Sequence, residues 1–114
     1  MRQARTTNSP SAGPDEPCYV ISVVARVVGV HSQTLRYYEQ LGLIAPWRTG
    51  GNVRLYSAKD VERARRIKTL MEELGINLAG VEVVLRMAER MAEMEKHMQR
   101  MAEELEEARR SARP

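Results

Sequence analysis

The sequence predicts a mainly α-helical fold, with a winged helix-turn-helix domain followed by one long C-terminal coiled-coil helix. Two short helical patterns, separated by Gly29 and ended by Gly42, indicate the helix-turn-helix unit. A Gly50-Gly51 turn between two β-prone runs indicates the wing. A heptad pattern of apolar residues from Val84 onward indicates the coiled coil. The 114 residues have room for one small domain and one appended element.

The domain boundaries follow from composition. Pro, Gly, Ser and Thr dominate the N-terminal segment, so we expect a disordered tail and order that begins near Tyr19. The expected organisation is a disordered tail at 1–17, the winged domain at 18–87, the dimerisation helix at 88–110 with a seam starting near residue 84, and a disordered tail at 111–114.

Hydroxyl residues and glycines set the expected helix ends in the first half. Ser22 is expected to cap a helix over Val23–Val28, with Gly29 as its stop. Gly29 to His31 then form a tight turn. Ser32 is expected to cap a second helix over Gln33–Leu41, which Gly42 ends.

A hairpin and a third helix are expected next. Leu43–Pro46 and Val53–Tyr56 are the two β-prone arms of the wing. Ser57 is expected to cap a helix over Ala58–Leu74 that stops at Gly75. Asn77 is then expected to cap a further helix that starts at Leu78.

The last helix carries a heptad seam of apolar residues. Its length would be roughly 50 Å at 1.5 Å per residue, and the small chain offers it no partner, so we expect it to pair with a second copy. Methionine sulfur can bind Cu(I), but the heptad spacing favours packing. The candidate dimerisation residues are Val84, Met87, Met91, Met94, Met98, Met101, Leu105 and Ala108.

Charge is distributed unevenly along the chain, whose net charge is +3. Residues 19–68 contain nine Lys or Arg residues against three acidic residues, whereas residues 78–110 contain six against eight. A basic first half joined to a helical second half is typical of a nucleic-acid reader with a protein–protein element. Such imbalance is also common in other proteins.

Several classes of function are disfavoured. Cys18 is the only cysteine, so neither a disulfide framework nor a CxxC metal pair can form within the chain. No GxxxxGK or HExxH motif occurs, and no nucleophile–base pair is visible, so we expect neither an enzyme nor a cofactor nor a metal site. No apolar run approaches the roughly 20 residues of a membrane span, and the N-terminus lacks a signal-peptide core. We therefore expect a cytoplasmic protein without a sensor domain after the coiled coil.

The candidate DNA contacts lie at helix starts, in the turn and on the wing. Glutamine can read adenine through paired hydrogen bonds, and arginine can hold phosphate or guanine. Alternatives stay open: the wing could be a solvated hairpin, His31 could only cap the turn, and the cations from Arg63 to Lys68 fit a solvated face. The candidates are Ser22, His31, Ser32, Gln33, Thr34, Arg36, Tyr37, Arg48, Asn52, Arg54, Tyr56 and Lys59.

Four blocks of sequence carry a family resemblance: Ile21–Ala25, Thr34–Glu39 with Leu41–Leu43, Arg54–Tyr56 followed by Asp60–Val61, and Gly75–Leu78. Over roughly residues 19–87 the chain resembles the MerR family of winged-helix regulators. Three further blocks, Tyr19–Ser22, His31–Arg36 and Gly75–Val81, are similar to its heat-shock repressor (HspR) branch. The wing departs from that branch, which more often carries a run of Gly and paired Arg where this chain has Thr49–Leu55.

The resemblance implies a homodimeric repressor of chaperone and protease genes that binds an inverted repeat and uses the DnaK chaperone as a co-repressor. It also implies that Arg36 and Tyr37 serve the DNA backbone, which leaves base reading to Ser32 and Gln33. Two alternatives remain open: another MerR-type regulator that activates by distorting promoter DNA, and a coiled-coil adaptor that binds protein.

Overall fold

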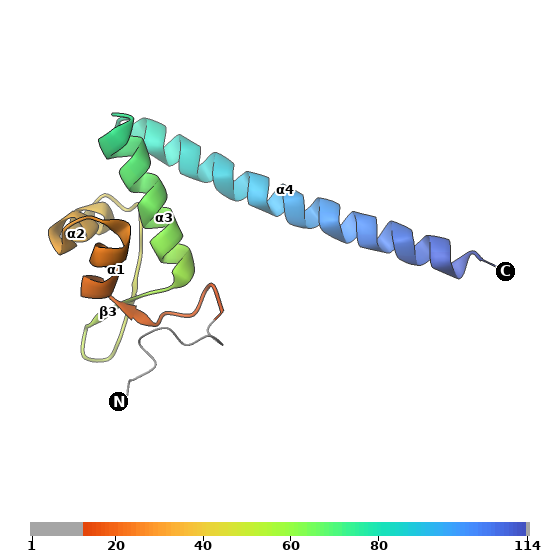
Figure 1. The fold of residues 1–114 in the computed structure, drawn as a ribbon, viewed down its shortest axis with the longest axis horizontal. Helices are drawn as coiled ribbons and strands as arrows, with labels where there is room; N and C mark the ends of the chain where they lie inside the picture. The colour runs from red at the N-terminus through yellow and green to blue at the C-terminus, as the bar shows by residue number, and fades with distance from the viewer. Residues whose placement is uncertain (1–12, 114) are drawn as a thin grey trace. The chain divides into compact units, whose positions relative to one another are not determined.

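The computed structural model describes residues 13–113 and divides the chain into two compact units that meet between Asn77 and Leu78 (Figure 1). The first unit contains three strands and three α-helices. The first two helices form the helix-turn-helix pair, and the third follows the wing. The second unit contains one helix, α4 (Leu78–Ser111).

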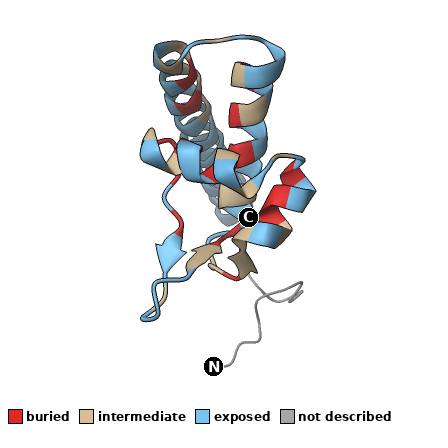
Figure 2. Ribbon diagram, turned by 90° about the vertical axis from the view of Figure 1, so that its left-hand side faces the viewer, coloured by how far each residue is buried: buried red, intermediate tan, exposed pale blue. Residues whose placement is uncertain are grey.

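The helix-turn-helix pair consists of α1 (Ile21–Val28) and α2 (Ser32–Gln40). Each helix buries one side: α1 contributes Val24, Ala25 and Val28, and α2 contributes Leu35 and Tyr38. Buried positions recur along one side of these helices rather than all around them (Figure 2). This one-sided burial leaves the opposite side of α2 available for contacts.

Glycine ends α1 as expected. Gly29 adopts φ 86°, a left-handed conformation that disfavours other residues, and its amide donates to the Ala25 carbonyl. Gly42 has φ 77° just after α2, where its amide donates to the Glu39 carbonyl. Both predicted stops are confirmed.

The two predicted serine caps are wrong. The residue before α1 is Val20 and the residue before α2 is His31, and neither helix start has a side-chain capping hydrogen bond. Strand β1 (Tyr19–Val20) runs directly into α1, so its pairing in the sheet holds Val20 in the extended conformation that a capping side chain would otherwise stabilise. At α2 the His31 carbonyl opens the helix by accepting from Thr34 and Leu35 amides. Ser22 and Ser32 are therefore first-turn residues.

The wing is an antiparallel hairpin of β2 (Trp47–Arg48) and β3 (Arg54–Tyr56), as expected. Its first arm was placed wrongly, because Leu43, Ile44 and Pro46 are buried in the connection rather than extended in the sheet. A run of only four apolar residues does not distinguish a short strand from a buried loop.

A third strand was not anticipated. Strand β1 pairs with β3, with Tyr19 opposite Tyr56, so the order of strands in the sheet is β1-β3-β2. Two residues are too few to produce an alternating pattern in the sequence.

Helix α3 (Ala58–Lys68) begins with a complete capping box, which confirms Ser57 as its cap. The Ser57 hydroxyl accepts from the Asp60 amide at 3.0 Å, and the Asp60 carboxylate accepts from the Ser57 amide at 2.9 Å. A π-helical turn, η2 (Thr69–Glu73), replaces the last turns of the expected α-helix. The Leu74 amide accordingly donates to the Thr69 carbonyl, five residues back.

The segment before Tyr19 makes backbone hydrogen bonds to β3 and α3. The Cys18 amide donates to the Tyr56 carbonyl, and the Pro14 carbonyl accepts from the Lys59 amide. Cys18 itself is buried. The remaining parts of the two predicted tails, residues 1–12 and Pro114, lie outside the described residues.

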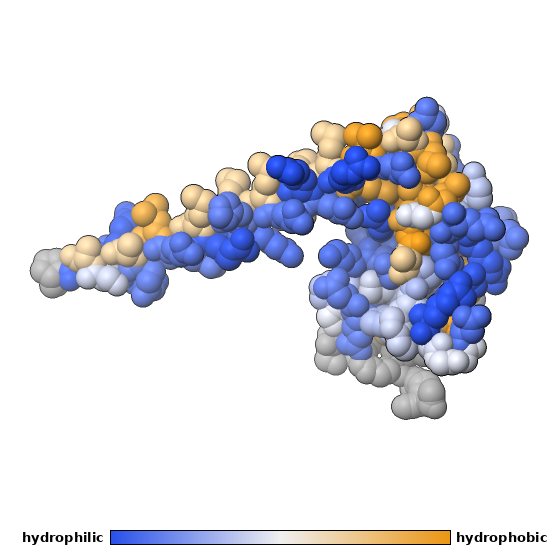
Figure 3. Space-filling model, turned by 180° about the vertical axis from the view of Figure 1, so that it is seen from behind, coloured by the Kyte–Doolittle hydropathy of each residue, from blue (hydrophilic) through white to orange (hydrophobic). Residues whose placement is uncertain are grey.

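Helix α4 spans Leu78–Ser111 and starts where the sequence predicted. Val81 and Leu85 are its buried residues. Six large apolar side chains further along are more than half exposed, and Figure 3 shows apolar residues following one line along the helix. They are Met87, Met91, Met94, Met98, Met101 and Leu105. Within residues 13–113, no helix is both long and apolar enough to cross a membrane.

Candidate nucleic-acid interface

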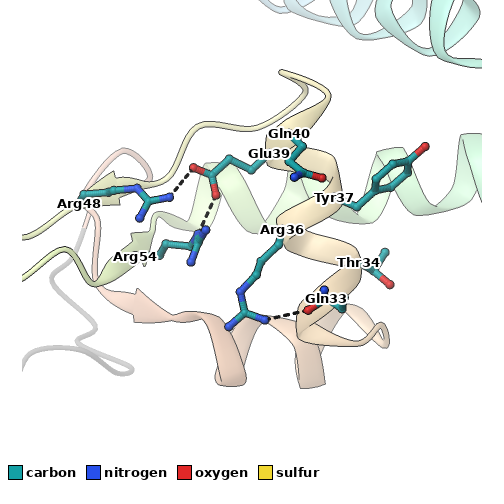
Figure 4. A pocket seen from close by; sticks show the side chains of 8 residues that line it. All are labelled: Gln33, Thr34, Arg36, Tyr37, Glu39, Gln40, Arg48 and Arg54. Carbon is teal, nitrogen blue, oxygen red and sulfur yellow. Dashed lines mark hydrogen bonds and ion pairs between the residues drawn. The ribbon is translucent and has the colours of Figure 1, made fainter.

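A hollow of about 680 Å³ lies between α2 and the wing. Figure 4 shows that three guanidinium groups, those of Arg36, Arg48 and Arg54, extend toward this space. Three cations around one hollow suit an anionic ligand with several oxygen atoms. The complete lining consists of Gln33, Thr34, Arg36, Tyr37, Glu39, Gln40, Arg48 and Arg54.

The exposed side of α2 provides polar groups without apolar cover. Gln33 and Arg36 are both exposed and joined by a hydrogen bond of 3.2 Å from Arg36 Nη1 to Gln33 Oε1. Tyr37 is half exposed, whereas its neighbour Tyr38 is buried and donates to the Glu72 carboxylate at 2.8 Å. Burial and the Glu72 carboxylate raise the pKa of Tyr38. Tyr38 therefore belongs to the interior of the domain, whereas Gln33, Arg36 and Tyr37 line the hollow.

Glu39 joins α2 to both arms of the wing. Its Oε2 accepts from Arg48 Nη2 at 2.9 Å, and its Oε1 accepts from Arg54 Nε at 2.7 Å. Burial alone would raise the pKa of Glu39, but the hydrogen bonds and charges of the two arginines outweigh it and lower that pKa. The carboxylate is therefore ionised at neutral pH.

The turn of the wing is held by its own side chains. Thr49 Oγ1 accepts from the amides of Gly51 and Val53, and Asn52 adopts φ 67°. Asn52 Oδ1 also accepts from Arg48 Nη1 at 3.2 Å. Asn52 thus acts within the structure by orienting Arg48.

The hollow brings together half of the predicted DNA contacts. Gln33, Thr34, Arg36, Tyr37, Arg48 and Arg54 all line it. His31 and Ser32 lie just before them, at the start of α2.

The other predicted contacts lie elsewhere. Ser22 is in the first turn of α1, and Lys59 is in the first turn of α3, where its ammonium lies 3.5 Å from the Asp15 carboxylate. Neither lines the hollow.

Tyr56 is a buried residue and not a surface contact, so its predicted role is corrected. Its exposed fraction is 0%, and its hydroxyl has no hydrogen-bond partner among the described residues. Burial raises its pKa to about 12. In strand β3 its side chain points to the opposite face from Leu55, its neighbour in the strand, and fills the core.

Sequence reasoning missed Glu39 and Gln40. A basic interface gives no reason to expect an acidic contact, although Glu39 follows Arg36 by three residues, one turn along the same side of a helix. Gln40 follows Arg36 by four residues and lies on the same side for the same reason.

The remaining cations of α3 lie apart from the hollow. Arg65 and Arg66 are exposed and do not line it. Arg63 Nε donates to the Leu43 carbonyl at 2.5 Å, so that residue supports the connection between α2 and the wing. No group of three or more potential metal ligands occurs among residues 13–113.

Comparison with known families gives one decisive match. The model of the MerR HTH family of regulatory proteins matches residues 19–88, which is more than half of the chain. The chain belongs to the MerR family. The MerR match covers α1, α2, the wing and α3, together with the first turns of α4.

Two curated proteins are also similar to this chain. A Streptomyces coelicolor protein described as the heat shock protein HspR is 44% identical over 94 residues, covering 82% of this chain and 62% of that protein. The HTH-type transcriptional regulator GlnR of Bacillus anthracis is 39% identical over 77 residues, covering 68% of this chain and 59% of GlnR. The chain thus spans less than two thirds of the length of either relative.

The MerR fold is also found among solved structures. The structure of HiNmlR, a MerR family regulator lacking the sensor domain and bound to promoter DNA, superposes with a TM-score of 0.54. The match covers 82% of this chain and 76% of HiNmlR at 20% identity. A structural similarity at 20% sequence identity shows that the two proteins share a fold.

Proposed function

We propose that this protein is a sequence-specific transcriptional repressor of heat-shock genes that binds an inverted repeat as a homodimer. The observation that carries the DNA-binding part is the hollow between α2 and the wing, where three guanidinium groups lie beside the polar front of α2. Phosphate oxygens match such a set of cations, and a recognition helix presents its polar front to the major groove.

The side chains divide into two roles. Arg36, Arg48 and Arg54 would contact phosphates, which position the protein without reading sequence. Ser32 and Gln33, at the start of α2, would read base edges. Tyr37 is half exposed beside Arg36 and would add a hydroxyl contact to the backbone.

The heat-shock assignment is supported by the 44% identity with HspR. A MerR-type regulator of another gene set is the second candidate, including one that activates by distorting promoter DNA, because GlnR also matches at 39% identity. The regulated genes distinguish these candidates, and the residues of the interface are compatible with both.

The dimer is supported by the exposed seam of α4. A lone helix with six large apolar side chains more than half exposed would leave that surface in water. Pairing two copies along the heptad seam removes it from water. We propose an antiparallel pair, in line with the family resemblance.

A selection of genomic fragments tests the proposal. Purified protein should retain fragments from upstream of chaperone or protease genes that contain an inverted repeat. Retention of fragments from unrelated operons would favour the second candidate. Equal retention of all fragments would contradict sequence-specific binding, and retention of none would leave a coiled-coil adaptor as the better account.

A further inference from the structure

Glu39 is the single acidic residue among the eight that line the hollow. A carboxylate repels phosphate, so its presence among three guanidinium groups needs a physical reason. Simple electrostatics predicts that its removal would strengthen binding to any DNA. The contacts of Glu39 indicate the opposite for a specific site.

Arg48 and Arg54 are directly opposite one another in the β2–β3 hairpin. Like charges at such a position repel and destabilise the pairing of the strands. Glu39 reaches from α2 and gives one oxygen to each arginine, at 2.9 and 2.7 Å, so a single carboxylate offsets the repulsion (Figure 4).

Both arginines keep donors for a ligand. Arg54 uses Nε for Glu39, and no hydrogen bond between described residues occupies its two terminal nitrogens. Arg48 donates one hydrogen bond from Nη2 to Glu39 and one from Nη1 to Asn52. Because each terminal guanidinium nitrogen carries two hydrogens, each keeps one for a ligand.

We propose that Glu39 is a positioning residue of the DNA interface, whose carboxylate fixes the wing arginines relative to α2 so that phosphate contacts and base contacts form in one register. This inference rests on the proposed DNA-binding function. Pre-organised cations lose less freedom on binding, and they fit only a duplex whose phosphates match their spacing.

The test compares Glu39→Gln with Glu62→Gln, which removes the same charge from an exposed position on α3 outside the hollow. A glutamine amide replaces one of the two carboxylate oxygens with an NH2 donor, so the two hydrogen bonds that Glu39 accepts cannot both form in this arrangement. Affinities are measured for the fragment selected from the genome and for a random-sequence duplex of equal length. We expect both variants to bind the random duplex at least as tightly as the unmodified protein does.

The selected fragment separates the variants. Glu39→Gln should bind it about tenfold more weakly, as the loss of one charge-assisted hydrogen bond would cause, whereas Glu62→Gln should not. If Glu39→Gln binds the selected fragment and the random duplex more tightly in parallel, Glu39 is only a repulsive charge and the proposal is overturned.

A measurement without DNA keeps this inference separate from the proposed function. In nitrogen-15 NMR spectra the Arg54 Nε–H should give a signal protected from water exchange, and Glu39→Ala, which leaves no acceptor, should remove that protection. If this signal is not protected in the unmodified protein, the proposed role of Glu39 in holding Arg54 is overturned, even if DNA binding is specific. A protected signal in a protein that prefers no genomic fragment would instead contradict the proposed function alone.

A variant that fails to fold would not end the test. The carboxyl carbon of Glu39 can be titrated in the unmodified protein, free and bound to the selected fragment. A lowered pKa of Glu39 in both states supports ion pairs with the two arginines that persist on DNA. An ordinary pKa of Glu39 in the bound state overturns the proposal.

Discussion

Gln33 and Arg36 share a hydrogen bond on α2, yet we expect their substitutions to affect DNA binding differently. Arg36→Ala removes a phosphate contact, so affinity should fall for all sequences and the dependence of log affinity on log salt should become shallower by about one unit. Gln33→Ala should instead relax discrimination at one base pair in each half-site, at a cost of about 1–3 kcal/mol. Competition binding with point-substituted operators at several salt concentrations measures both effects.

Gln40→Ala is the control for that experiment, because Gln40 lines the same hollow at the far end of α2. It should leave discrimination at that base pair unchanged. Equal losses of operator and random-DNA affinity in Gln33→Ala would contradict a base-reading role for Gln33.

The ion pairs of Glu39 also predict a dependence of stability on pH. The folded state lowers the pKa of Glu39 below its ordinary value of 4.5, so the ionised form is favoured by folding. Its contribution is fully present above that ordinary value and is lost as pH falls through the lowered pKa. The difference in melting temperature between the unmodified protein and Glu39→Gln should therefore be largest near neutral pH and shrink under acid conditions. A difference independent of pH would contradict this account.

At the scale of elements, the capping box of α3 supplies a measurable contribution to stability. Ser57→Ala removes the hydroxyl that accepts from the Asp60 amide, and it should lower the free energy of unfolding by about 1 kcal/mol. Ser22→Ala is the matched control, because Ser22 makes no capping bond in α1, and it should change stability by less than about 0.5 kcal/mol. Denaturant titration at one fixed protein concentration gives both values, and equal effects would contradict the assignment of caps.

The seam of α4 gives a second prediction for an element. Lysine in place of both Met94 and Met98 would bury charge between paired helices, so the dimer should dissociate. Light scattering should then report the 13.0 kDa of one chain, in contrast to twice that mass for the unmodified protein. Ala92→Lys with Gln99→Lys adds the same charge on the outer side of the heptad and should leave the dimer intact. An unchanged mass for the seam variant would contradict the proposed dimer.

Sequence patterns predicted the elements better than their ends. The helical periodicity and the glycine stops located α1, α2 and α4 within one or two residues. The two serine caps and the first arm of the wing were wrong, because pairing of β1 with β3 and burial of Leu43 and Ile44 are tertiary effects that no local pattern records. The π-helical turn at Thr69–Glu73 adds one residue to a turn without altering composition.

For the interface, charge and hydrogen-bonding capacity identified six of the residues that line the hollow. Tyr56 was misplaced because a tyrosine in a strand can point to either face, and the register of a three-residue strand depends on its neighbours. Glu39 was missed because its role depends on two arginines of the hairpin, 9 and 15 residues further on, which only the packing of α2 against the wing brings to it.

At the scale of the whole molecule, we expect regulation through a partner. A chaperone that binds the DNA-competent form raises occupancy of the operator by mass action, and this effect is lost when misfolded proteins compete for the chaperone. Purified protein should therefore bind its operator more tightly when DnaK is added, and truncation after Glu95 should abolish that gain. The mass of the truncated protein has to be measured alongside, because the truncation also removes part of the seam.

A denatured client protein added in excess provides the control, since it should reverse the gain by occupying DnaK. Operator affinity that ignores DnaK at every concentration, yet falls steeply with temperature, would favour direct thermal sensing.

Trp47 is the only tryptophan in the chain, and it lies more than half exposed on β2 beside Arg48. All of the protein's indole fluorescence therefore arises from one site on the wing. Docking of the wing on a duplex changes the solvent around that indole, so emission should shift or be quenched as DNA is added. The protein thus carries its own optical probe, and the engagement of the wing with DNA can be followed in stopped flow without an attached dye.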